Sequence, residues 1–165
     1  MVNGYLFDTN HVKYWFDSNP NILEHLKAVP NRAPIVISAI TLGEIEYGHQ
    51  IVSPSGPTGI QTDFSGFVQN QFPLVIPITA ATSSYYGTIR TRLFERFAPV
   101  RKKRKGRRPE QLLDPVTSRE LGIQENDIWI ASQALERNLV LVTNDSLRRV
   151  KEVVAELQIE NWMQP

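Results

Sequence analysis

Short apolar runs rich in β-branched residues alternate along the chain with longer stretches whose apolar residues recur at helical spacing. The runs predict strands at residues 2–8, 34–39, 73–78 and 139–143, with a possible final edge strand at 159–163. The periodic stretches predict helices at residues 11–18, 19–29, 41–50, 60–72, 79–97, 127–138 and 146–157. Thr9 or Asn10 can cap the first helix, and Thr41 opens the third.

Alternation of buried strands with helices is typical of a parallel sheet covered on both faces. The predicted fold class is therefore α/β, a three-layer α/β/α sandwich with a central parallel sheet, formed by residues 1–165 as one domain. Residues 98–124 interrupt the pattern between a helix and the segment that begins at Asp127. This stretch is expected to be an inserted loop with little fixed structure.

Four acidic residues stand where the pattern changes from strand to helix. Asp8 ends the run VNGYLFD, Glu44 follows IVISAITLG, Asp127 opens DIWIASQAL, and Asp145 follows LVLVTN. Right-handed crossovers place the carboxyl ends of parallel strands at one edge of the sheet, so these side chains are expected to meet. Clustered carboxylates repel one another and normally require a divalent cation. The pattern favours metal-dependent phosphodiester chemistry.

Each acid also has a purely structural explanation. Thr41 and Glu44 have the spacing of a capping box, and Asp145 can cap the helix that follows it. Asp127 suits the first turn of its helix, and Asp8 can form an Asx turn. Capping explains each residue separately, but it does not explain why all four junctions hold an acid.

The composition is that of one globular domain. The chain has 165 residues, of which 41% are hydrophobic, and it contains no cysteine. Disulfides, thiolate catalysis and cysteine-bound zinc are therefore excluded. The first residues lack the basic start and apolar core of a signal peptide, and no segment reaches membrane-spanning length. We expect a soluble, cytoplasmic protein with no membrane contact.

The net charge of +1 conceals one strongly basic segment. The run RKKRKGRR at 101–108 holds seven of the 18 basic residues, and the rest of the chain has 11 basic against 17 acidic residues. Such a run attracts polyanions through counterion release, which favours RNA contact, although a solvated loop is the alternative. The predicted RNA-binding residues are Arg101, Lys102, Lys103, Arg104, Lys105, Arg107 and Arg108.

Four segments in this order, YLFDTN, SAITLGEIEYG, ENDIWIASQAL and LVTND, resemble the PIN-domain ribonucleases, and most of all the VapC-like toxins of type II toxin–antitoxin pairs. The resemblance covers nearly the whole chain. It implies an endoribonuclease dependent on Mg²⁺ or Mn²⁺, usually a homodimer, that a cognate antitoxin holds inactive. The chain departs from the family in the connector before Asp127, which has about 29 residues instead of a few.

The resemblance also implies roles for individual residues. Asp8, Glu44, Asp127 and Asp145 match the family's acidic quartet, in which Asp8 and Asp127 would be the principal metal ligands. Small polar residues that support the metal and its water match Asn10, Thr143 and Asn144. Asn10 has a second explanation as a helix cap.

Hard carboxylate oxygens suit Mg²⁺ or Mn²⁺, and the absence of cysteine argues against zinc. A bound divalent ion activates water and stabilises charge on the scissile phosphate. The expected reaction is attack by water in line with the departing 3′ oxygen, giving 5′-phosphate and 3′-hydroxyl ends. Glu44 or Asp145 would orient or deprotonate the water, and one metal ion or two remain open.

Other functions explain less of the sequence. A non-catalytic nucleic-acid-binding module would use the basic run and keep the acids only as caps. A haloacid-dehalogenase-type phosphatase needs a second Asp two residues after the first, where this chain has Asn10, and the residues of a phosphoacceptor receiver domain are not evident. His11, His25 and His49 show no ligand spacing, which favours surface or cap roles for them.

Overall fold

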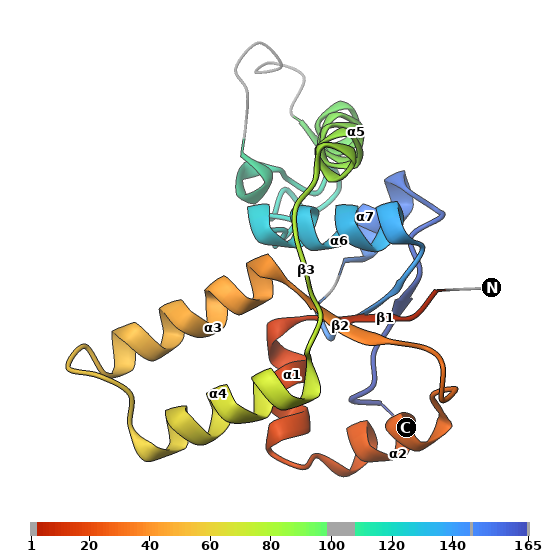
Figure 1. The fold of residues 1–165 in the computed structure, drawn as a ribbon. Helices are drawn as coiled ribbons and strands as arrows, with labels where there is room; N and C mark the ends of the chain where they lie inside the picture. Colours follow the sequence, from red (N-terminus) through yellow and green to blue (C-terminus); the bar gives the residue numbers. More distant parts are fainter. Residues whose placement is uncertain (1–2, 99–107, 146, 165) are drawn as a thin grey trace.

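The computed structural model describes residues 3–98, 108–145 and 147–164. In these residues a five-stranded sheet has the strand order β3-β2-β1-β4-β5, and every neighbouring pair is parallel (Figure 1). The strands are β1 (Tyr5–Phe7), β2 (Ile35–Ser38), β3 (Val75–Ile76), β4 (Val140–Val142) and β5 (Ile159–Glu160). The predicted parallel sheet is confirmed.

Helices cover both faces of the sheet. The helices are α1 (Thr9–Phe16), α2 (Pro20–Ala28), α3 (Ala39–Val52), α4 (Gly59–Gln71), α5 (Ala80–Phe97), α6 (Glu125–Arg137) and α7 (Arg148–Val153). In Figure 1, α5, α6 and α7 lie on one side of the sheet, α1, α2 and α4 lie on the other, and α3 projects beside α4. No helix within the described ranges has both the length and the apolar character needed to cross a membrane.

The pleat of the strands divides the core between the two faces. Leu6 and Leu141 pack into the cluster formed with α5, α6 and α7, whereas Phe7 and Val142 pack with α1, α2 and α4. Asp8 follows Phe7 at the carboxyl end of the central strand and donates its backbone N–H to the Val142 carbonyl at 3.1 Å. The fold therefore fixes the backbone of Asp8 at the sheet edge.

Several element boundaries differ from the sequence prediction. Helix α3 begins at Ala39, because the Ser38 hydroxyl accepts a hydrogen bond from the Ile40 N–H at 2.9 Å and caps it there. The capping box that offered a structural explanation for Glu44 does not form, because Ser38 and not Thr41 is the N-cap. Strand β3 is shorter than predicted. Pro77 follows it directly and Pro73 lies two residues before it, and proline lacks the N–H that a ladder requires. Helix α7 is also shorter than the predicted 146–157.

The expectation of little fixed structure in the insertion is wrong for residues 108–124. This stretch forms the 3₁₀ helix η2 (Pro109–Gln111) and an antiparallel bridge between Leu113 and Glu120. Leu112 and Ile123 are buried in the cluster with α5, α6 and α7, so the segment is held by core packing. The rest of the basic run, 101–107, lies outside the described residues.

Candidate active site

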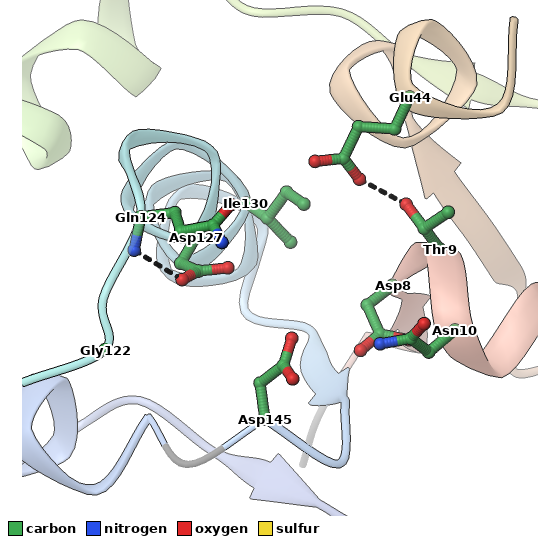
Figure 2. Close-up of a pocket in the computed structure, with 9 residues that line it drawn as sticks. All are labelled: Asp8, Thr9, Asn10, Glu44, Gly122, Gln124, Asp127, Ile130 and Asp145. Carbon is green, nitrogen blue, oxygen red and sulfur yellow. Dashed lines mark hydrogen bonds between the residues drawn. The ribbon is translucent and has the colours of Figure 1, made fainter. Parts of the chain in front are cut away.

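Four acidic side chains from four separate segments of the chain line one cavity of about 340 Å³ at the carboxyl edge of the sheet (Figure 2). Asp8 follows β1, Glu44 lies on α3, Asp127 lies on α6, and Asp145 follows β4. The other lining residues are Thr9, Asn10, Gly122, Gln124 and Ile130. The chain thus brings together acids that are up to 137 positions apart in sequence (Asp8 to Asp145).

Asp8 lines the cavity and is also the N-cap of α1. It is only 7% exposed, and its Oδ1 accepts the His11 N–H at 2.7 Å. Asp8 therefore takes the capping position that the sequence assigned to Thr9 or Asn10. Its other oxygen, Oδ2, is buried without a hydrogen-bond partner among the described residues.

His11 lies directly behind this carboxylate. Its side chain is fully buried, with Nδ1 at 3.0 Å from Asp8 Oδ1. The predicted surface or cap role of His11 is therefore wrong, because the ring occupies the inward side of α1 next to buried Val12.

Glu44 joins three helices at the cavity. Its Oε2 accepts a hydrogen bond from the Thr9 hydroxyl of α1, and its Oε1 accepts one from the Asn126 amide of α6 at 2.7 Å. Both oxygens are therefore held by side chains far away in sequence. These bonds replace the local capping contact that the sequence suggested for Glu44.

Asp127 and Asp145 face the interior of the cavity in Figure 2. Asp127 is the third residue of α6, and its Oδ2 accepts the Gln124 N–H at 2.7 Å, so its expected place in the first turn is confirmed. The position of Asp145 is fixed through its backbone, because its N–H donates a hydrogen bond to the Thr143 hydroxyl at 3.0 Å. Helix α7 starts beyond Asp145, with Leu147 at its N-cap, so Asp145 does not cap it.

The four acids interact electrostatically. Burial is the main cause that raises the pKa of Asp127 to about 6; the hydrogen bond from Gln124 opposes this rise, and the charges of Asp145, Glu44 and Asp8 contribute to it. Burial also raises the pKa of Asp145, with Asp8 and Glu44 acting in the same direction and His11 opposing them. The site therefore favours binding of either protons or a cation.

The predicted supporting residues fall in different places. Asn10 lines the cavity, but Thr143 and Asn144 do not. Thr143 is buried and holds the Asp145 backbone, while Asn144 is exposed, with its amide nitrogen 3.5 Å from the Tyr14 hydroxyl. Of the predicted RNA-binding residues only Arg108 is described, and it is exposed.

Sequence reasoning missed the residues that hold the acids in place. Thr9 and Asn126 each stand next to a predicted acid, yet nothing local indicates that both would bind Glu44. Gly122 and Gln124, at the end of the insertion, line the cavity as well. The long connector is therefore part of the wall of the site.

The side chains that line the cavity have the oxygen atoms that a hard divalent cation binds. Carboxylate oxygens are the ligands that Mg²⁺ and Mn²⁺ prefer, and the unpaired, buried Oδ2 of Asp8 is an atom that a cation would satisfy. Within the described part of the chain, however, no three His, Asp or Glu side chains are positioned as a ready-made metal site. Coordination would require the carboxylates to move closer together.

Comparison with known proteins agrees with this architecture. Residues 5–153 match the family described as PIN domain. The chain is 30% identical over 167 residues to Ribonuclease VapC2 of Rickettsia felis. The match covers 96% of this chain and 97% of that protein.

Solved structures give the same result. A chain in the crystal structure of VapBC2 from Rickettsia felis bound to a DNA fragment from their promoter is 27% identical, with a TM-score of 0.67 over 96% of this chain and 98% of that one. A chain of VapBC-1 from nontypeable Haemophilus influenzae, 20% identical, has the same fold, with a TM-score of 0.68 over 97% and 98% of the two chains. The resemblance carried by four sequence segments is confirmed, and the chain belongs to the PIN domain family.

Proposed function

We propose that this protein is a metal-dependent endoribonuclease and the toxin of a toxin–antitoxin pair. The observation that carries the proposal is the meeting of Asp8, Glu44, Asp127 and Asp145 in one cavity. The 30% identity to a protein named as a ribonuclease supports RNA as the substrate.

Asp8 and Asp127 would be the principal ligands of Mg²⁺ or Mn²⁺, with Glu44 and Asp145 completing the acidic wall. When bound, the cation lowers the pKa of a coordinated water and stabilises negative charge on the phosphate. Glu44 or Asp145 would orient the attacking water and accept its proton. Thr9 and Asn126 hold Glu44 in place for this task by their hydrogen bonds.

The water would attack phosphorus in line with the departing 3′ oxygen. The P–O3′ bond then breaks and the 3′ oxygen takes a proton from solvent, so that the ends are 5′-phosphate and 3′-hydroxyl. Thr143 supports the reaction indirectly, since its hydroxyl fixes the backbone of Asp145. The basic run from Arg101 to Arg108 attracts the RNA backbone and offsets the repulsion between the acidic cavity and phosphate.

Asp8→Asn is expected to abolish cleavage while the fold is retained, because Asn caps a helix as well as Asp does but lacks the anionic oxygen. The loss should exceed the roughly 10–100-fold that removal of an outer-shell partner typically causes. The measurement is mapping of cleavage ends on RNA incubated with purified protein and Mg²⁺ or Mn²⁺.

Asp17→Asn is the matched control, since Asp17 lies at the end of α1 in an exposed ion pair with Lys13. A fully active, metal-stimulated Asp8→Asn protein would refute the assignment. RNA binding by the wild-type protein without metal-stimulated cleavage would instead favour a non-catalytic nucleic-acid-binding module.

The partners we propose are a cognate antitoxin and a second copy of the chain. The similarity to a chain of the VapBC2 structure supports a toxin that works with a partner protein. Expression of the neighbouring reading frame together with this chain should relieve the growth arrest expected when the toxin is expressed alone. The two proteins should also elute as a complex on size-exclusion chromatography.

A further inference from the structure

His11 is a fully buried titratable group that contacts Asp8, one of the candidate metal ligands. Its ring packs edge-on against Phe7 and Tyr14, with centroid separations of 6.0 and 5.8 Å. These contacts restrict rotation of the imidazole. Nδ1 lies 3.0 Å from Asp8 Oδ1, whereas Nε2 is buried without a partner among the described residues.

Two donors converge on one oxygen of Asp8. The backbone N–H of His11 reaches Oδ1 at 2.7 Å, and the ring reaches the same atom at 3.0 Å. An ionised carboxylate only accepts hydrogen bonds, so Nδ1 of His11 carries the proton in this contact. The second oxygen, Oδ2, is left unpaired by the described protein atoms.

A single backbone hydrogen bond leaves the carboxylate of an Asp free to turn, because its terminal torsion is broad and nearly two-fold. A second donor on the same oxygen, from a ring fixed by aromatic neighbours, restricts that rotation. The result is that one oxygen is held for the helix cap and the other remains available to a ligand.

We propose that His11 is a positioning residue: its Nδ1–H fixes Oδ1 of Asp8, so that Oδ2 is held ready for a divalent cation. This inference rests on the proposed function. Outer-shell hydrogen bonds of this kind orient metal ligands and typically change metal affinity by about 10–100-fold.

The alternative is that His11 only fills space in the core. A buried imidazole with an unpaired nitrogen is less favourable there than an aliphatic side chain of similar size. A space-filling role therefore predicts that His11→Leu is harmless in every respect, whereas a positioning role predicts a loss that is confined to metal binding.

The test compares His11→Leu with His11→Asn, since the amide Nδ2 of Asn occupies the same place in the side chain as Nδ1 of His. Mn²⁺ affinity is measured by calorimetry on purified, metal-free protein, and stability is measured by thermal unfolding without metal. His11→Leu should bind Mn²⁺ roughly 10–100-fold more weakly while its thermal midpoint is unchanged or higher. His11→Asn should keep most of the affinity despite a lower midpoint, because it leaves a cavity.

Wild-type Mn²⁺ affinity in His11→Leu would overturn the inference. A loss of affinity in His11→Asn as large as that in His11→Leu would also overturn it, because the amide donor that Asn retains would then make no difference. Asp8→Asn separates this result from the proposed function. If Asp8→Asn loses Mn²⁺ binding and cleavage while His11→Leu keeps both, only the role of His11 fails. If Asp8→Asn keeps both, the proposed function itself fails.

Discussion

Asp8 and Asp127 each line the acidic cavity and also accept a backbone N–H at the start of a helix through one carboxylate oxygen. Oδ1 of Asp8 accepts the His11 N–H, and Oδ2 of Asp127 accepts the Gln124 N–H. A helix N-terminus carries a partial positive charge, which lowers the cost of gathering negative charge beside it. Capping and the proposed metal binding are therefore compatible functions of one side chain.

Asp127 gives the site a defined pH dependence. Its pKa of about 6 in the folded protein lies above the ordinary 3.8, so the metal-free fold binds a proton that the unfolded chain releases. Ionised Asp127 therefore destabilises the metal-free fold above about pH 6, and this effect disappears as the pH falls through 6 towards 3.8.

Asp127→Asn is accordingly expected to raise the thermal midpoint of metal-free protein at neutral pH, with the gain vanishing in acid. Thermal unfolding across a pH series checks this, with Asp17→Asn again as the exposed control. A gain of the same size at every pH would contradict the explanation. In the wild type, Mn²⁺ affinity should fall as the pH drops below about 6, because the proton competes with the cation.

Helix α6 is fixed at its start by the inserted segment. Oε1 of Glu110, a residue of η2, accepts the N–H of Glu125 at 2.9 Å. This bond satisfies one of the free N–H donors at the start of α6. The insertion also bonds to α7 through the ion pair between Asp114 and Arg149. It therefore supports the helix that carries Asp127.

Glu110→Ala is expected to lower the free energy of unfolding by about 1 kcal/mol, the usual loss for a helix cap. Glu110→Gln keeps an acceptor oxygen and should lose less. Urea unfolding measures the difference, and the matched control is Glu120→Ala, an exposed acid on the same inserted segment. Equal midpoints for Glu110→Ala and Glu120→Ala would show that the contact with α6 does not matter.

At the scale of the whole molecule, charge is unevenly divided between the basic run and the rest of the chain. Replacement of the seven basic residues from Arg101 to Arg108 by Gln should weaken binding to single-stranded RNA and flatten its salt dependence. Each lost phosphate contact reduces the slope of log K against log salt by about 0.7.

Fluorescence anisotropy at a series of salt concentrations measures this slope. The control replaces Lys13 and Lys27, exposed lysines on the α1–α2 side. An unchanged slope in the Gln variant would show that the run is only a solvated loop. The cleavage rate on saturating short RNA should stay the same, because the acidic cavity is untouched.

The sheet and the four acids were predictable because their signals are local. Apolar runs define strands, and Asp8 and Asp145 stand directly after such runs, while Glu44 and Asp127 stand near the starts of periodic helical stretches. The helix caps at Asp8 and Ser38 were missed because neighbouring polar residues offered equally good caps. The burial of His11 and Leu112 depends on packing with residues distant in sequence, which a single histidine or leucine does not reveal.

The family match ends at residue 153, but the core does not. Strand β5 pairs with β4 beyond that point, and Trp162, 2% exposed, packs edge-on against Phe7 at a centroid distance of 5.0 Å. An excised fragment of 5–153 would leave one edge of β4 unpaired and uncover the ring that immediately precedes Asp8. Subcloning to the family boundary would thus remove the packing next to Asp8, the proposed metal ligand, although all four acids of the cavity would still be present.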